Sequence, residues 1–487
     1  HGIIDANIAG QGLYLNGHGG ITNTGLLEAT DGGILQISNQ LVNNSGGTVA
    51  ANGGTVVISD SSIAYGQTLS MGSGEIEGGL VLANGGAIRF DNGEAVGSTL
   101  SSLNGGTLGV DSSYLARLSG VTLSTGNTWT AAQGSQTFLR DSLTNNGNFQ
   151  IIGGGGNDTF LTVESNLTLL GAGFVTLNSG DNHGRAYIQS NGIYTLTNGD
   201  NMIQGYGNIG NTGMSFINGP SGTVNANVSG QTLIVSTIQN KGLLEATSGG
   251  TLQVTNRIIN AGYVVVGGGS ELDVGANGTN TYFQNAGQTL VANGGTLKAG
   301  MIQETGGTMQ VDGILDPINI DLESGELGGT GTLYGDLSNR GHIILGDSVL
   351  DPGTLSLVGN FLQTDGVMFE SIDDSSNGIL DVTGNVGLTG WLDVGLLDGF
   401  TPVDGREFTF LKYSGTESGT LGVIGPASAD WTVIYEPGFV ELEFNRVSLN
   451  TVADKGMTCA LLGVGLAGLG YLYRPLRRLS GQRVGEG

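Results

Sequence analysis

Two acidic segments carry the side chains best suited to hold a metal ion. The first, residues 153–161, reads GGGGNDTFL and places Asp158 directly after a glycine-rich turn. Calcium prefers carboxylate oxygens, and Asp158 would ligate it against a neighbouring turn of the chain. The second segment groups Asp373, Asp374 and Asp381. Both are candidate calcium sites, but the first motif occurs once, which favours an ordinary glycine corner, and a solvated loop explains the second. We expect no other cofactor.

Residue types that support acid–base catalysis come together in one glycine-rich bend, at Asp181, His183 and Arg185. They could serve as acid, base and anion holder in a lyase, but a single loop without partner carboxylates favours a structural bend. The Gly-His-Gly tripeptide at 17–19 resembles a motif of polygalacturonases, whose Asn-Thr-Asp and Arg-Ile-Lys elements the sequence lacks. No Gly-x-Ser-x-Gly elbow or phosphate loop occurs either. We therefore expect the protein not to be an enzyme.

The composition predicts short strands joined by tight bends. Glycine supplies 92 of the 487 residues and proline 7, while hydrophobic residues make up 38% and charged residues 12%. The glycines lack the period of collagen, and the hydrophobic content is too high for a disordered linker. Most of the polar surface must consist of Asn, Ser, Thr and Gln, which form turns and tolerate strands. A single cysteine excludes an intrachain disulfide.

The negative charge lies entirely in the body of the chain. The net charge is −26; from Val452 onward, five basic and two acidic residues give +3, so the preceding residues carry −29. A body of this charge repels phosphate groups. We therefore expect no nucleic acid partner.

A large unit of the sequence occurs twice. GLLEAT at 25–30 returns at 242–247, and GGILQISNQLVNN at 32–44 returns as GGTLQVTNRIINA at 249–261. Within each copy, Gly-Gly pairs precede short alternating runs, often about 20 to 30 residues apart, which is typical of solenoid coils. One coil cannot bury its apolar face alone, whereas stacked coils pair their backbones and layer their side chains. The sequence predicts an all-β fold, an elongated parallel β-helix (β-solenoid).

The chain divides into four expected parts. Residues 1–223 should form the first solenoid unit and residues 224–341 a partial second copy. From His342 onward the residue composition changes and aromatic residues become more frequent. This change predicts a C-terminal capping β module over 342–449. Its runs DPGTLSL at 351–357, LDVTGNV at 380–386, GFTPV at 399–403 and WTVIY at 431–435 resemble the closing module common in autotransporter-like passengers and PEP-CTERM β-solenoids. The last part, 450–487, carries the features of a sorting tail.

The tail predicts a single C-terminal transmembrane helix. Residues 457–473, MTCALLGVGLAGLGYLY, are uncharged and as a helix would extend about 25 Å at roughly 1.5 Å per residue. Arg474, Arg477 and Arg478 follow at once and would stop transfer through the membrane. The positive-inside bias puts this end in the cytoplasm and the body outside.

The five residues before this helix are Val452, Ala453, Asp454, Lys455 and Gly456. Motif, apolar run and arginine cluster together resemble the VPDSG type of PEP-CTERM sorting signals, with Ala and Lys where that type has Pro and Ser. The resemblance implies an exosortase, an integral membrane cysteine protease, as partner. It also implies transient membrane anchoring and a final place on the surface of a bacterium or outside it.

These features together predict a non-enzymatic extracellular structural or adhesive protein. Exposed solenoid ends are self-complementary edges that only a cap keeps from pairing, so the sequence is compatible with a monomeric rod and with self-association into fibres or biofilm matrix. The alternative is a polysaccharide-binding or polysaccharide-degrading β-helix protein, with exopolysaccharide as partner. Such a protein needs aromatic side chains along one face, and the first 340 residues offer few.

Overall fold

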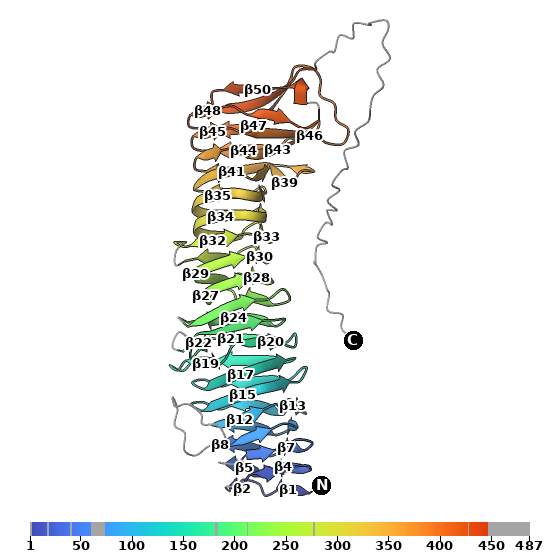
Figure 1. Ribbon diagram of the computed structural model, residues 1–487, viewed down its shortest axis with the longest axis vertical. Helices are drawn as coiled ribbons and strands as arrows, with labels where there is room; N and C mark the ends of the chain where they lie inside the picture. Colours follow the sequence, from blue (N-terminus) through green and yellow to red (C-terminus); the bar gives the residue numbers. More distant parts are fainter. Residues whose placement is uncertain are drawn as a thin grey trace. The chain divides into compact units, whose positions relative to one another are not determined.

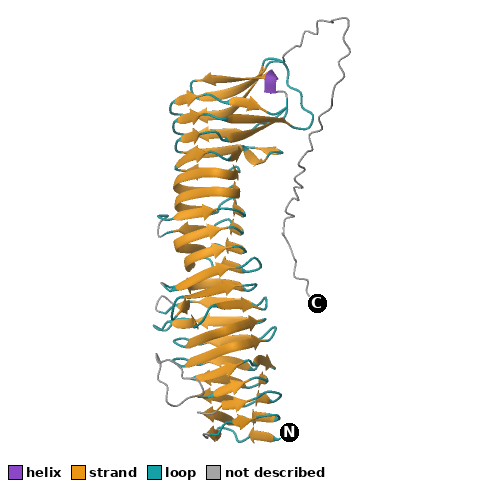
Figure 2. Cartoon of the chain, in the orientation of Figure 1, coloured by secondary structure: helices purple, strands orange, loops and turns teal. Residues whose placement is uncertain are grey.

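The computed structural model describes residues 2–16, 19–38, 41–59, 74–180, 184–211, 213–275, 278–426 and 428–446. In this part of the chain the regular structure is β-strand, apart from the 3-10 turn η1 (Ser428–Asp430) (Figure 2). None of its helical segments has the length and apolar character needed to cross a membrane. The predicted helix at 457–473, with the sorting motif and the arginines beside it, lies outside the described residues.

The strands form a coil with three faces. Strands of successive coils pair in parallel, which produces three stacks that we call faces A, B and C in the order B, A, C along the chain (Figure 1). Seven long strands turn one or two corners and belong to more than one face: β15 (Leu115–Leu123), β17 (Gln136–Asn145), β24 (Met202–Ile209), β27 (Thr232–Asn240), β29 (Thr251–Asn260), β34 (Thr296–Val311) and β35 (Ile314–Gly328). The predicted all-β parallel β-solenoid is confirmed.

The other strands each lie in one face. Face A contains β1 (Ile3–Ala6), β4 (Leu26–Thr30), β7 (Thr48–Asn52), β10 (Leu80–Asn84), β13 (Thr99–Leu103), β20 (Leu167–Leu170), β23 (Tyr194–Asn198), β25 (Met214–Asn218), β32 (Thr281–Gln284), β37 (Asp336–Asn339), β42 (Phe361–Gln363), β45 (Val386–Leu388) and β48 (Glu417–Gly419). Face B contains β3 (Ile21–Thr22), β6 (Leu41–Asn43), β9 (Glu75–Glu77), β12 (Gly93–Val96), β19 (Thr159–Val163), β22 (Ala186–Ser190), β31 (Glu271–Val274), β36 (Thr332–Tyr334), β41 (Thr354–Val358), β44 (Ile379–Val382) and β47 (Arg406–Tyr413). Face C contains β2 (Gly12–Asn16), β5 (Ile34–Ser38), β8 (Thr55–Ser59), β11 (Ala87–Asp91), β14 (Thr107–Val110), β16 (Thr128–Ala131), β18 (Asn148–Ile152), β21 (Phe174–Asn178), β26 (Thr223–Ala226), β28 (Leu243–Ala246), β30 (Tyr263–Val266), β33 (Gln288–Val291), β38 (His342–Ile344), β43 (Val367–Ile372), β46 (Trp391–Leu396) and β49 (Gly422–Ile424).

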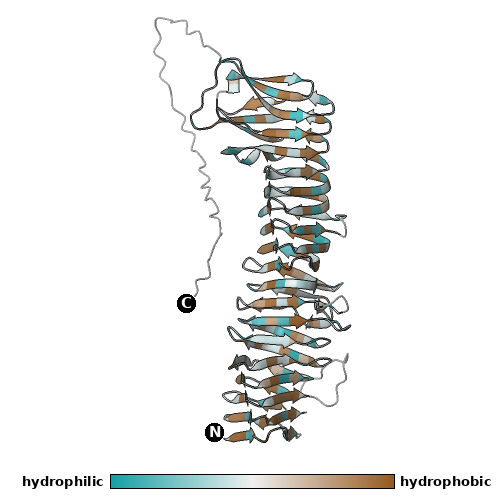
Figure 3. Ribbon diagram, turned by 180° about the vertical axis from the view of Figure 1, so that it is seen from behind, coloured by the Kyte–Doolittle hydropathy of each residue, from teal (hydrophilic) through white to brown (hydrophobic). Residues whose placement is uncertain are grey.

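The core fills the inside of the coil with columns of apolar side chains. Because successive strand residues point to opposite sides, every second residue faces inward, and hydrophilic and hydrophobic residues alternate along the strands (Figure 3). Val224, Leu244 and Val264 share one register position in three successive coils, and each is at most 1% exposed. Burial of one such side chain contributes roughly 1.5–3 kcal/mol to stability.

A second kind of column, made of amides, fixes the corner between faces A and C. Asn198, Asn218, Asn240 and Asn260 are fully buried, and each donates from Nδ2 to Oδ1 of the next, at 3.0, 2.9 and 2.9 Å. Nδ2 of Asn240 also donates to the backbone carbonyl of Tyr263 at 2.9 Å. Buried amides destabilise a protein unless they are hydrogen-bonded, so this ladder holds successive coils in register.

The duplicated sequence returns one face further round the coil. Residues 26–30 form β4 in face A, whereas the matching residues 243–246 form β28 in face C. The next run is displaced in the same way, since β5 lies in face C and its copy begins β29 in face B. The three faces accept the same pattern because each needs only alternating apolar residues and a corner of glycine or asparagine.

Near its C-terminal end the pairing becomes antiparallel. The coil continues across position 342, and β47 then pairs with β51 (Phe439–Phe444), which pairs with β50 (Trp431–Glu436), both antiparallel. The Trp431 ring contacts Phe408 and Phe444, with ring centroids 5.9 and 5.0 Å apart. A short antiparallel hairpin, β39 (Gly346–Ser348) with β40 (Asp351–Pro352), interrupts the coil between β38 and β41.

Candidate functional site

Asp158 lies in a glycine corner that joins two coils. Gly154, Gly155 and Gly156 have φ of 125°, 60° and 82°, in the region that favours glycine. Oδ1 of Asp158 accepts a hydrogen bond from the backbone N–H of Arg185 on the next coil, at 2.8 Å. Among the described residues no three His, Cys, Asp or Glu side chains come together as a metal site. The carboxylate therefore has a structural partner, and calcium binding at Asp158 stays a prediction.

The acidic segment between β43 and β44 does not converge on one point. Asp373 accepts the backbone N–H groups of Ser375 and Ser376, both at 2.6 Å, and their hydroxyl groups at 2.9 and 2.8 Å. These hydrogen bonds, that from the Ser375 N–H foremost, lower the pKa of Asp373 to about 2. Asp374 is paired instead with Nη1 of Arg406 at 2.8 Å, and Asp381 lies on β44.

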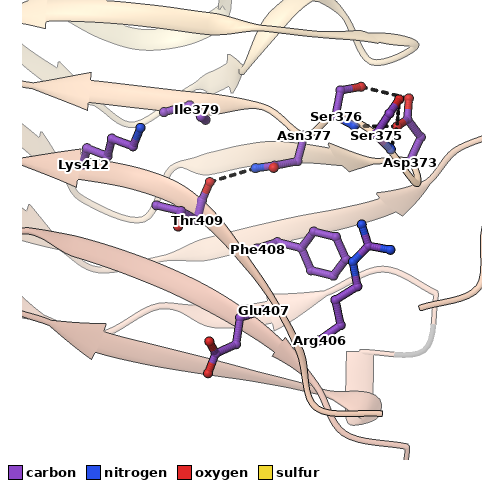
Figure 4. A pocket seen from close by; sticks show the side chains of 10 residues that line it. All are labelled: Asp373, Ser375, Ser376, Asn377, Ile379, Arg406, Glu407, Phe408, Thr409 and Lys412. Atoms are coloured by element: carbon purple, nitrogen blue, oxygen red, sulfur yellow. Dashed lines mark hydrogen bonds between the residues drawn. The ribbon is translucent and has the colours of Figure 1, made fainter. Parts of the chain in front are cut away.

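Beside this segment is a pocket of about 360 Å³ against β47 (Figure 4). Several of its polar groups are paired: Asn377 donates from Nδ2 to the carbonyl of Thr409 at 2.8 Å. The guanidinium of Arg406 lies 5.0 and 4.9 Å from the ring centroids of Phe400 and Phe408. These contacts hold the loop before β44 against β47, and we assign this pocket a structural role.

A second pocket, of about 300 Å³, lies at the corner between faces C and B. Tyr206 stands at this corner between Gly205 and Gly207, which have φ of 101° and 155°. A Cβ on Gly205 would lie 2.1 Å from the carbonyl oxygen of Leu177, so only glycine fits. The bend projects Tyr206, whose hydroxyl donates to Oδ1 of Asn178 at 2.7 Å. The pocket is lined by Ser179, Gly180, Arg185, Tyr206, Gly207, Asn208, Gly230, Gln231, Thr232 and Ile234.

Only part of the acid–base group named from the sequence can be placed. Arg185 lines this second pocket, whereas Asp181 and His183 lie outside the described residues. Of the Gly-His-Gly tripeptide at 17–19, only the last residue is described. The structure brings Arg185 close to Tyr206 and Gln231, which sequence reasoning missed. One feature of the sequence pointed to this site: the run MIQGYGNI, in which glycines lie on both sides of an aromatic residue.

An aromatic pair continues from this pocket along face B. Phe160 and Tyr187 occupy the same register position on successive coils, and their ring centroids lie 5.2 Å apart at 22°. On the next coil that position is Asn208, which lines the pocket. Both rings are partly exposed. Face B therefore carries one stacked aromatic pair beside this pocket.

Charged side chains are buried together on face B, nearer the N-terminus. Arg117 binds Glu164 through Nε at 2.9 Å and Nη2 at 3.3 Å, and its Nη1 lies 3.6 Å from Glu94. Arg117 is 1% and Glu94 2% exposed. Burial raises the pKa of Glu94 above its ordinary value despite the neighbouring cation. Because Arg117 and Glu94 are almost completely buried, we assign this network a structural role.

No protein-family model matches the sequence, and no curated protein matches it either. The fold places the chain in the class of parallel β-solenoid proteins, which includes both enzymes and non-enzymes. Function must therefore be argued from the surface and the sites of this chain.

Proposed function

We propose that the chain is a non-enzymatic extracellular structural or adhesive rod of a bacterial cell surface. The observation that carries the proposal is the continuous parallel stacking of face A, from the pairing of β1 with β4 to that of β45 with β48. Each coil completes the backbone hydrogen bonds of its neighbours and adds about 4.8 Å of length. Such stacking favours an extended, rigid scaffold.

The outer surface supports the same proposal. Charged residues are few, and amide and hydroxyl side chains link neighbouring coils on the outside, as in the bond from Gln253 Nε2 to Asp273 Oδ2 at 3.0 Å. Such amide and hydroxyl groups can donate and accept hydrogen bonds across a lateral contact between rods. We propose that the rods associate with one another into fibres or matrix.

Electron microscopy of the purified body tests the assembly. We expect filaments or bundles whose length increases with protein concentration. Uniform short particles at high concentration would contradict self-association.

Export and sorting depend, in this proposal, on the C-terminal segment. Residues 452–456 serve as the recognition motif of an exosortase-type protease, residues 457–473 span the membrane, and Arg474, Arg477 and Arg478 stop transfer. Support comes from the order of the three features in the sequence. Mass spectrometry of the mature surface protein should find a C-terminus near Val452; a surface protein that retains Gly487 would contradict processing.

Binding or degradation of polysaccharide is the second candidate function. The aromatic pair on face B and the polar pocket beside it are the observations that support this candidate. Incubation with neutral and acidic polysaccharides separates the possibilities. Release of reducing ends would contradict the non-enzymatic proposal, whereas retention without turnover would support binding.

A further inference from the structure

Polar side chains without partners surround the second pocket. In the described part of the chain, four of its lining side chains make no hydrogen bond or ion pair: Arg185, Asn208, Gln231 and Thr232. Together they supply amide donors and acceptors, a hydroxyl and a guanidinium. The pocket thus offers hydrogen-bonding groups of every neutral kind together with one cation.

The same residue types are paired elsewhere on the outside of the coil. Asn225 donates from Nδ2 to Oε1 of Glu245 at 2.7 Å and accepts from the hydroxyl of Thr247 at 3.0 Å. Gln204 reaches Thr176 of the preceding coil at 3.4 Å. Outward polar residues can therefore bond between neighbouring coils, whereas the four side chains at the pocket are left available to a ligand.

The aromatic pair gives this pocket an apolar rim. Tyr187 lies one coil from Asn208 and is backed by Phe160. Aromatic rings bind the C–H faces of sugars through the ring face, which carries negative charge. Because Phe160 stacks on one face of Tyr187, the face of Tyr187 toward Asn208 and the pocket is the one left for a sugar. Free amides and hydroxyls can hydrogen-bond to the hydroxyl groups around the edge of a pyranose unit, while the neighbouring aromatic ring contacts its apolar face.

We propose that this pocket and its aromatic rim bind a neutral polysaccharide that runs along face B. Successive coils repeat about every 4.8 Å, a spacing comparable with the length of one hexose unit, so consecutive sugars meet consecutive coils. The charge of the body disfavours polyanionic chains. The proposal goes beyond the scaffold function, because a rod needs no ligand site, and it names the ligand for the second candidate function.

Affinity electrophoresis of the full chain tests the site, with xyloglucan, galactomannan and dextran as neutral probes and alginate as the acidic probe. We expect retardation by at least one neutral probe and none by alginate. Gln231→Ala removes an exposed side chain without a partner, and Tyr187→Ala removes half of the rim. Each should weaken binding at least tenfold, and Tyr187→Phe should restore it.

Tyr263→Ala is the matched control, because Tyr263 is an exposed ring on face C, 53% accessible. It should leave binding unchanged. Three results would each overturn the proposal. They are an equal loss of binding in the control, unaltered binding by the Gln231→Ala and Tyr187→Ala variants, and a protein that no neutral probe retards. Electron microscopy of the same variants keeps the two proposals apart, since loss of glycan binding with intact rods leaves the scaffold function standing.

Discussion

Gln284 donates a hydrogen bond from Nε2 to Oε1 of Glu304, at 3.1 Å, inside the coil. Glu304 is 2% exposed and ends a buried ladder that Gln284 joins to Asn260 at 3.2 Å. Burial raises the pKa of Glu304 well above its ordinary value, and the bond from Gln284 opposes this effect only in part. The ladder of neutral amides therefore ends in a carboxyl group whose charged form is disfavoured by burial.

Glu304→Gln should stabilise the protein at pH 7 and reduce the pH dependence of its stability. A carboxyl group with a raised pKa in the folded state contributes stability below its unfolded pKa of 4.5, and this contribution is lost as the pH rises toward the folded value. The amide keeps a carbonyl acceptor without that loss. We expect a gain of about 1 kcal/mol in the free energy of unfolding at pH 7, measured by chemical denaturation between pH 4 and 8.

Glu323→Gln is the control for this experiment, because Glu323 accepts from Gln303 Nε2 at 2.7 Å in an equivalent pair on the exposed surface. Its replacement should change the free energy of unfolding by less than about 0.5 kcal/mol at every pH. Equal responses from the inner and outer variants would show that burial of Glu304 has no energetic consequence.

Asn240→Ala should destabilise the coil by about 2–4 kcal/mol, because it breaks the amide ladder at its centre. The alanine leaves a cavity and removes one partner each from Asn218 and Asn260. The neighbouring Gln239 points outward and is exposed, so Gln239→Ala serves as control, with a change under about 0.5 kcal/mol. Thermal unfolding followed by circular dichroism measures both, and an Asn240 variant as stable as the control would contradict a structural role for the ladder.

The coil could be predicted from the sequence because its signals are local. Gly-Gly pairs and alternating runs mark corners and faces within single stretches of chain. The displacement of β28 relative to β4 by one face could not be predicted, since it depends on loop lengths accumulated over many coils. The second pocket was missed for a similar reason: Arg185, Tyr206 and Gln231 are distant in sequence and meet only when three coils are stacked.

Gly242→Ala should disrupt the corner that follows the amide ladder. A Cβ there would lie 2.1 Å from the carbonyl oxygen of Gly219 and 2.3 Å from that of Gly222, so backbone must move. Overpacking of this kind costs about 1–3 kcal/mol, and more where the backbone itself must move. Gly267→Ala is the matched substitution, because its nearest neighbour would be 3.4 Å away, and the change should stay within about 1 kcal/mol. Equal melting temperatures for the two variants would contradict the close approach of the coils at Gly242.

Arg117→Ala should destabilise the protein by about 3–5 kcal/mol, because it leaves the buried carboxylates of Glu94 and Glu164 without their main cation. The comparison is Lys298→Ala, which breaks the partly exposed pair with Glu271 at 2.7 Å and should change stability by less than about 1 kcal/mol. Urea denaturation at low and high salt measures both effects. Since salt screens the exposed pair far more than the buried network, only the Lys298 effect should decrease at high salt; a salt-sensitive loss in the Arg117 variant would contradict burial of the network.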